Sequence, residues 1–236
     1  LAGRRVLLTV QQEGKTLEVV AKPISLAEEG RLLYQRWVRR NREEVERLSG
    51  GRLGYVHIPG MHDGAYRTVF EEALGRHAQA EGLVVDTRNN GGGDLVADLA
   101  MFLSGKAFFT YGTDTRATGF EPNFRWTKPV ISLANEANYS DGHCYTCMVQ
   151  ALGLGKLVGM PVPGTCSFAG WELLQDPTLR WGTVPVGVKN TAGQYLENRQ
   201  SEPDLLVANT PETASAGRDL QLEAAVAELL RQLRSK

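Results

Sequence analysis

The chain has 236 residues, with 26 basic and 27 acidic side chains and a hydrophobic content of 42%. This balance of charge excludes a strongly basic surface, and no apolar run is long enough for a membrane-spanning helix, so neither nucleic-acid binding nor membrane insertion is expected. The length suits one large domain with a small additional segment. Because the first residue is Leu1, we expect a piece of a longer protein, whose compartment the sequence leaves unknown.

The first part of the chain predicts a hairpin followed by a long helix. Apolar residues alternate on both sides of Glu13-Gly14-Lys15, which is typical of a β-hairpin over residues 4–24. Two strands alone are too few to bury a core. A charged amphipathic helix follows from Ser25 to Ser49, and Gly50-Gly51 ends it. We therefore divide the chain into residues 1–25, a linker helix over 26–50 and a main domain over 51–236.

Strands and helices alternate through the main domain, which is typical of the α/β class. The short apolar runs that predict strands are 55–58, 83–87, 129–134 and 156–159. The segments expected to be helical are 65–77, 95–103, 142–152 and 219–233, and a hairpin is expected within 171–188.

One serine lies where a predicted buried strand passes into a helix. Ser140 follows the apolar run 129–134 and precedes the helix 142–152. At such a turn the hydroxyl is exposed, and the N–H groups of the helix start can stabilise an anion beside it. A serine nucleophile needs this geometry. The alternative interpretation is that Ser140 only caps the helix, with Asp141 in its first turn.

Three successive glycines, Gly91, Gly92 and Gly93, follow the strand 83–87. Glycine reaches positive φ and lets peptide N–H groups approach a ligand atom closely. The sequence lacks both common phosphate-loop patterns, so an oxyanion hole, which needs only one or two N–H donors, fits better. The alternative is a flexible turn in which Asp94 caps the next helix.

The three cysteines, Cys144, Cys147 and Cys166, predict no metal site, because one C-x-x-C pair without partners is a poor zinc ligand set. Their odd number argues against a disulfide framework. We expect buried free thiols, since cysteine packs well in protein cores. No metal and no other cofactor is predicted.

Five collinear motifs carry a family resemblance: Gly54–Pro59, Val85–Gly93, Asn135–Gly142, Leu152–Gly159 and Leu196–Asp204. Together they resemble the tail-specific, or C-terminal processing, serine peptidases, and within them the tricorn-like branch. The resemblance implies the spiral β/α superhelix shared by Clp-type proteases and crotonases, with the opening hairpin as the end of a PDZ domain. It also implies peptides or unfolded protein tails as substrates. A homo-oligomer stays open.

The resemblance also implies roles for single residues. Ser140 matches the nucleophile, and the backbone N–H groups of Gly93 and Asp141 match the oxyanion hole. Glu197 matches a carboxylate that orients the general base in the tricorn-like branch. This role depends on the resemblance alone, because a glutamate in a loop is otherwise expected to be solvated.

The chain departs from the family pattern at the general base, which a serine hydroxyl needs to become an effective nucleophile. Thr165 stands where the processing-peptidase branch has its lysine, and the tricorn branch takes a histidine from upstream of the PDZ domain. His143, one helical turn from Ser140, and His62 are the candidate substitutes. We expect the base to be missing from this chain, which should then be nearly inactive alone.

Two other classes of protein remain as alternatives. A peptidase-like fold can lose catalysis and bind a peptide or a hydrophobic ligand, and the missing base favours this class. A crotonase-like acyl-CoA enzyme would also use paired N–H donors. No basic cluster suggests a site for the CoA phosphates, so this class ranks lower.

Overall fold

The computed structural model describes residues 1–235, apart from the side chain of residue 117, and divides the chain into two compact units, Leu1–Asn41 and Arg42–Lys236. Helix α1 (Leu26–Ser49) belongs to the first unit up to residue 41 and to the second from residue 42.

The first unit contains the predicted hairpin. Strands β1 (Val6–Gln12) and β2 (Lys15–Ala21) pair in antiparallel register from Val6↔Ala21 to Gln12↔Lys15. The turn residues Glu13 and Gly14 both have positive φ, +50° and +77°, as a two-residue hairpin turn requires. The hairpin and the helix are therefore confirmed, whereas the assignment of residues 1–25 to a PDZ domain stays a prediction.

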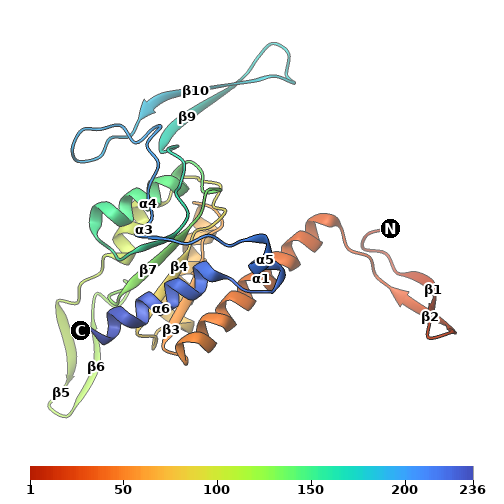
Figure 1. The fold of residues 1–236 in the computed structure, drawn as a ribbon, viewed down its shortest axis with the longest axis horizontal. Coiled ribbons are helices and arrows are strands. Elements are labelled where there is room, and N and C mark those ends of the chain that lie inside the picture. The colour runs from red at the N-terminus through yellow and green to blue at the C-terminus, as the bar shows by residue number, and fades with distance from the viewer. Residues whose placement is uncertain (236) are drawn as a thin grey trace. The chain divides into compact units, whose positions relative to one another are not determined.

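The second unit is built on a five-stranded parallel sheet (Figure 1). Its order is β11 (Leu205–Leu206), β8 (Leu157–Gly159), β7 (Val130–Ala134), β4 (Gly82–Asp86) and β3 (Leu53–His57). Every residue of β3, β4 and β7 is buried. Strands covered on both faces read as continuous apolar runs, which is why the sequence predicted them.

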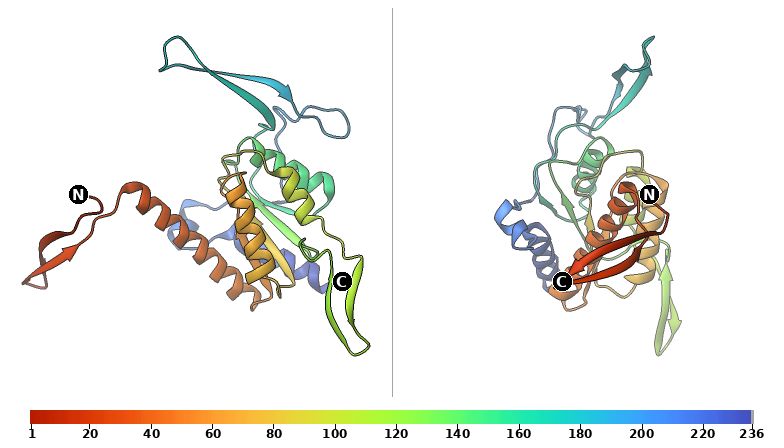
Figure 2. Two further views of the ribbon diagram at one scale, coloured as in Figure 1. Left: turned by 180° about the vertical axis from the view of Figure 1, so that it is seen from behind. Right: turned by 90° about the vertical axis from the view of Figure 1, so that its right-hand side faces the viewer.

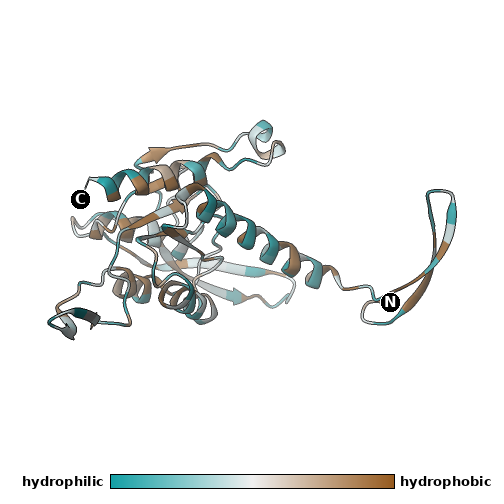
Figure 3. Ribbon diagram, turned by 90° about the horizontal axis from the view of Figure 1, so that it is seen from below, coloured by the Kyte–Doolittle hydropathy of each residue, from teal (hydrophilic) through white to brown (hydrophobic). Residues whose placement is uncertain are grey.

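Helices cover both faces of this sheet (Figure 2). One face carries α2 (Asp63–Glu71), the π-helical turn η1 (Glu72–Arg76), α3 (Val96–Leu103) and α4 (Asp141–Leu152). Their core includes Val56, Leu83 and Val85 of the strands, with Phe102 of α3 and Val149 of α4. The C-terminal helix α6 (Leu220–Arg234) contacts β4, β7 and β8, and follows the short helix α5 (Pro211–Ser215). Figure 3 shows that hydrophobic and hydrophilic residues alternate along α6, as expected for a helix with one buried side.

Two hairpins extend from this sheet domain. Strands β9 (Ser167–Leu173) and β10 (Arg180–Gly187) form the hairpin predicted within 171–188. Strands β5 (Phe109–Thr113) and β6 (Arg116–Glu121) form a hairpin that the sequence did not predict. Its register shifts between Tyr111 and Gly112, so it has no regular two-residue alternation.

The pairing of β4 with β7 positions the candidate site. Both strands run in the same direction, with Asp86 opposite Leu133, so the loops that follow them leave the same edge of the sheet. One loop holds the three glycines and the other leads to Ser140. This edge, beyond the carboxyl ends of parallel strands, is where α/β proteins commonly bind ligands.

Candidate active site

Ser140 occupies the N-cap position of α4 in a strained backbone conformation, with φ +53° and ψ −121°. Such a conformation at a residue other than glycine costs on the order of 1–3 kcal/mol and persists only where neighbours fix it. The Ser140 N–H donates to Thr165 Oγ1 at 2.8 Å. The Ser140 hydroxyl makes no capping bond, and it has no hydrogen-bond partner in the described part of the chain. The interpretation of Ser140 as only a helix cap therefore loses its support.

The glycine loop lies directly against Ser140. A Cβ atom on Gly92, whose φ is +88°, would come within 2.6 Å of Ser140 Cβ. A Cβ on Gly93, whose φ is +143°, would come within 1.9 Å of the Met61 carbonyl oxygen. Both positions therefore require glycine, for reasons of φ and of space.

Gly93 and Asp141 each present an unused backbone N–H. Met61 N–H donates to Gly92 O, and Asp94 N–H donates to Met61 O, both at 2.8 Å. The Gly92 carbonyl and the Gly93 N–H belong to one trans peptide group and point in opposite directions, so the Gly93 N–H points away from Met61. Asp141 is in the first turn of α4, where N–H groups lack helical partners. Within residues 1–235, neither of these N–H groups has an acceptor.

The Asp141 carboxylate caps a different helix from its own. Its Oδ2 accepts from Leu95 N–H at 2.7 Å and from Val96 N–H at 3.3 Å, at the start of α3. The N-cap residue of α3 is Leu95, so the alternative in which Asp94 caps this helix is wrong. Burial raises the pKa of the Asp141 carboxyl, and the two N–H donors oppose that rise. No local sequence pattern indicates a cap supplied by a residue so distant along the chain.

Asn90 is fully buried and holds the upstream side of the glycine loop. Its Nδ2 donates to Ile58 O and its Oδ1 accepts from Gly92 N–H, both at 2.8 Å. Its backbone carbonyl accepts from Tyr139 N–H at 2.9 Å, next to Ser140. Sequence reasoning assigned Asn90 no role, although its place directly before three glycines was the available signal.

His143 is fully buried beside the segment 163–167. Its Nδ1 accepts from the N–H groups of Thr165 at 3.1 Å and Cys166 at 3.0 Å, and its Nε2 lies 3.3 Å from Cys147 Sγ. Because Nδ1 accepts both of these hydrogen bonds, the ring proton must lie on Nε2. Burial lowers the pKa of His143, against the opposing effect of Glu197. The ring is therefore neutral, and its lone pair is already occupied, so this geometry offers Ser140 no base.

His62 is the other histidine considered as a base. It is exposed at the N-cap of α2, and its Nδ1 accepts from Ala65 N–H at 3.2 Å. A Cβ on Gly60 would lie 3.2 Å from the His62 ring and 3.7 Å from Gly92 O, so His62 borders the glycine loop. Its Nε2 has no hydrogen-bond partner among the residues that the structure describes. His62 stays a candidate without a contact to Ser140.

Glu197 is half-buried rather than fully solvated. Its Oε2 accepts from Ser167 Oγ at 2.5 Å, and the next residue, Asn198, donates its N–H to Gly164 O at 2.8 Å. Glu197 therefore lies along the segment 163–167, whose Thr165 binds Ser140. The structure brings the carboxylate to the site region, and its role stays a prediction.

A disulfide joins Cys144 of α4 to Cys166, with a Cα–Cα distance of 5.0 Å, while Cys147 is free. The expectation of three free thiols is therefore wrong for two of them. Spacing along the sequence could not show that the segment after β8 returns to α4. The disulfide ties the helix that begins at Ser140 to the segment that carries Thr165.

Among the described residues, no group of three or more His, Cys, Asp or Glu side chains could hold a metal ion. Likewise, no helix in residues 1–235 is both long and apolar enough to cross a membrane.

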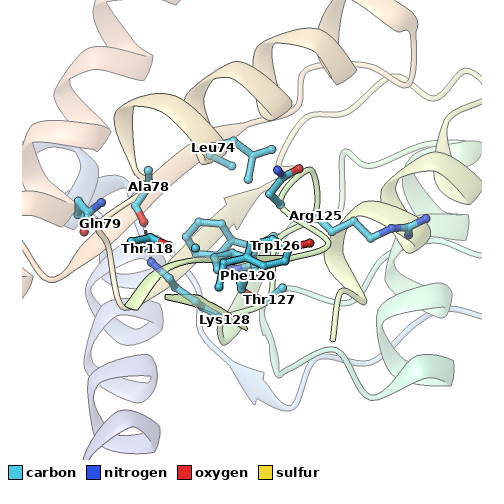
Figure 4. A pocket seen from close by; sticks show the side chains of 13 residues that line it. Leu74, Ala78, Gln79, Thr118, Phe120, Arg125, Trp126, Thr127 and Lys128 are labelled. Atoms are coloured by element: carbon cyan, nitrogen blue, oxygen red, sulfur yellow. Dashed lines mark hydrogen bonds between the residues drawn. The ribbon is translucent and has the colours of Figure 1, made fainter. Parts of the chain in front are cut away.

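A pocket of about 390 Å³ lies at the other end of the sheet, beneath the β5–β6 hairpin (Figure 4). Lys128 lines it and donates to the carbonyl oxygens of Ala78 and Ala80 at 2.7 and 2.6 Å. Its partial burial lowers its pKa. Lys128 precedes β7, whereas Ser140 follows it, so this pocket is separate from the serine site.

Comparison with known proteins identifies the family to which this chain belongs. A model of peptidase family S41 matches residues 52–207. Tricorn protease homolog 1 of Streptomyces coelicolor is 34% identical over 231 residues, covering 96% of this chain and 21% of that relative. The putative tricorn-like protease C-terminal subunit of Sulfurisphaera tokodaii is 31% identical over 242 residues, covering 98% of this chain and 27% of that relative.

A solved structure, the crystal structure of the tricorn protease, superposes with a TM-score of 0.83 at 27% identity. The match covers 99% of this chain and 23% of that chain. This chain therefore belongs to peptidase family S41, in its tricorn-like branch, and both the expected fold and the assignment to the serine-type peptidases are confirmed. It spans between 21% and 27% of the length of these relatives.

Proposed function

We propose that residues 51–236 form the catalytic core of a peptidase in which Ser140 attacks the carbonyl carbon of a peptide bond. The observation that carries this proposal is the strained Ser140, whose hydroxyl makes no cap, beside the two unused N–H groups of Gly93 and Asp141. Peptides and unfolded protein tails are the proposed substrates. The helix over 26–50 is the proposed linker, residues 1–25 the end of a PDZ-like domain, and a homo-oligomer the assembly to test.

The proposed reaction proceeds in two halves. Ser140 Oγ bonds to the substrate carbonyl carbon while a base takes the hydroxyl proton, and the carbonyl oxygen becomes an anion between the N–H groups of Gly93 and Asp141. The C–N bond then breaks, and the amine leaves with the proton from the base. Water next attacks the acyl-enzyme, gives a proton to the same base and releases the carboxylate. The base finally returns its proton to Ser140.

We propose that the general base is supplied from outside residues 1–235. This is supported by the Ser140 hydroxyl, which has no partner within these residues, and by His143, whose Nδ1 accepts two N–H bonds. Glu197 is proposed to orient the incoming base, from its position beside the segment 163–167. A carboxylate is a weak base for a serine hydroxyl, so Glu197 is not itself proposed as the base.

A fluorophosphonate probe and a peptide-hydrolysis assay on the complete protein test this function. Labelling is expected on Ser140, and Ser140→Ala should lower hydrolysis by about several hundred-fold or more. Ser104→Ala, at the end of α3, is the matched control and should change little. Hydrolysis unchanged in Ser140→Ala would contradict the proposal. The 236-residue chain alone should show only residual turnover, rising when the missing base is supplied.

A second function is favoured by the same missing contact at Ser140. Without a base, the site would be a non-catalytic module that binds peptides or hydrophobic ligands. A complete protein that binds peptides, resists the fluorophosphonate and hydrolyses nothing would support this function over catalysis.

A further inference from the structure

The two N–H groups of the proposed oxyanion hole come from segments far apart in the chain. Gly93 follows β4, and Asp141 begins α4. Both donors must lie about 2.7–3.1 Å from the same developing oxyanion. A misplacement of about 1 Å in such a site can lower the rate by about a hundredfold. The spacing of the two segments is therefore as important as the donors themselves.

We propose that the Asp141 side chain is the positioning residue that holds the two N–H donors at their working separation. The inference rests on the proposed function of the site and adds a role for a carboxylate that touches no reacting atom. One residue then supplies two things, a donor through its backbone and an anchor through its side chain.

The hydrogen bonds of Asp141 carry this inference. Oδ2 binds the N–H groups of Leu95 at 2.7 Å and Val96 at 3.3 Å. Leu95 is only two residues beyond Gly93, so the carboxylate fixes the downstream end of the glycine loop. Hydrogen bonds from N–H groups to a carboxylate are stronger than those between neutral groups. The cap of α3 also joins this helix to the residue that opens α4.

The upstream end of the loop is already fixed by Asn90. Its side chain holds Gly92 N–H and Ile58 O, and its carbonyl accepts Tyr139 N–H. A Cβ on Gly142 would lie 3.0 Å from Asn90 Oδ1, so Asn90 also packs on α4. Met61 also holds the loop, since its N–H donates to Gly92 O and its carbonyl oxygen accepts from Asp94 N–H, but Met61 lies in the segment before α2. The Asp141 carboxylate is the contact that ties the downstream end of the loop to α4 itself.

The effect of Asp141 can be separated from a general effect on the fold by changing the substrate atom that the N–H donors meet. An ester has a carbonyl oxygen at this point, whereas the matching thionoester has a sulfur, which is a weak hydrogen-bond acceptor. The complete protein is assayed with both forms of one short peptide ester. The variants are Asp141→Ala, Asp141→Asn and, as a control, Asp98→Ala, an exposed acidic residue in the first turn of α3.

Asp141→Ala is expected to lower kcat for the ester by about tenfold to a hundredfold with little change in KM. The decrease in kcat for the thionoester should be smaller, so the ratio of the ester rate to the thionoester rate falls. Asp141→Asn keeps one acceptor oxygen in place and should restore most of the ratio. Asp98→Ala should keep the wild-type ratio. Thermal midpoints measured in parallel show whether each variant is folded.

Equal losses on both esters in Asp141→Ala, or a ratio that Asp141→Asn does not restore, would overturn the inference and leave the proposed function standing. No hydrolysis by the wild type, or hydrolysis that survives Ser140→Ala, would overturn the proposed function and this inference with it.

Discussion

Two neighbouring glycines in the loop after β4 differ sharply in what a side chain would meet. A Cβ on Gly92 would come within 2.6 Å of Ser140 Cβ and 2.8 Å of Tyr139 O, whereas a Cβ on Gly91 has nothing within 4 Å. Gly92 also has a φ of +88°, which other residues adopt only with strain. Substitutions at these two positions therefore distinguish the steric requirement beside Ser140 from the general flexibility of the glycine-rich loop.

Gly92→Ala should destabilise the protein by about 1–3 kcal/mol and lower peptide hydrolysis by at least about tenfold, because the loop must move away from Ser140. Gly91→Ala should change the free energy of unfolding by less than about 0.5 kcal/mol. Urea denaturation and the hydrolysis assay measure both effects. The same small effect in both variants would mean that the loop does not lie against Ser140.

The neutral state of His143 gives the stability of the protein a defined dependence on pH. Burial lowers its pKa in the folded state below the ordinary value of about 6.5. The unfolded chain therefore binds the proton more tightly, so this contribution to stability is complete above the ordinary pKa. It is lost as the pH falls from there toward the lowered pKa of the folded state.

We expect the thermal denaturation midpoint to decrease as the pH is lowered from 7.5 to 5.5. The decrease should be less steep in His143→Gln, whose amide oxygen can accept the same N–H bonds. Part of the slope should remain, because burial also lowers the pKa values of His57 and His77. An unchanged slope in His143→Gln would show that this ring does not titrate with unfolding.

At the scale of elements, α4 and the segment 163–167 act as one structural piece. They are joined by the disulfide Cys144–Cys166. They are also joined by hydrogen bonds, from Thr165 and Cys166 to His143 and from Ser140 to Thr165. The predicted strand 156–159 and the helix 142–152 were both confirmed, as β8 and α4. Their connection through the disulfide was not foreseen, because the pairing depends on tertiary structure.

Reduction of this disulfide should destabilise the protein. Its cysteines are 22 residues apart, and the loop entropy of such a cross-link corresponds to about 3 kcal/mol. The double variant Cys144→Ser/Cys166→Ser should match the reduced wild type in thermal midpoint and lose hydrolytic activity. Cys147→Ser should retain the response to reductant, because its thiol is free. A midpoint insensitive to reductant in the wild type would refute this stabilising role.

For the whole molecule, the sequence predicted the central sheet better than its surroundings. The strands 83–87 and 129–134 were confirmed because burial on both faces makes them continuous apolar runs. The β5–β6 hairpin escaped prediction, since its turn at Asp114-Thr115 contains neither glycine nor proline, whereas the turns of the two predicted hairpins contain Gly14 and Pro177. A hairpin on the surface is recognised mainly by its turn residues, because its strands have no continuous apolar run.

The residues of the candidate site can likewise be divided into those with a local signal in the sequence and those without one. Ser140 and the glycines could be identified because a strand, a turn and a helix leave local signals in the sequence. Asn90, Thr165 and the Asp141 carboxylate act through hydrogen bonds between segments that are distant in sequence. Those contacts exist only once β4 and β7 are paired, so no local pattern records them.

The conformation of Ser140 also limits which hydroxyl amino acids the site can use. Threonine carries the same functional group, but its extra methyl branches from Cβ, the atom that faces Gly92. A β-branched residue at φ +53° is a steric outlier, and the loop leaves little room there. Serine and threonine carry the same hydroxyl group, but only serine fits the backbone conformation at position 140. Cysteine, which is unbranched, is the replacement nucleophile that the backbone permits.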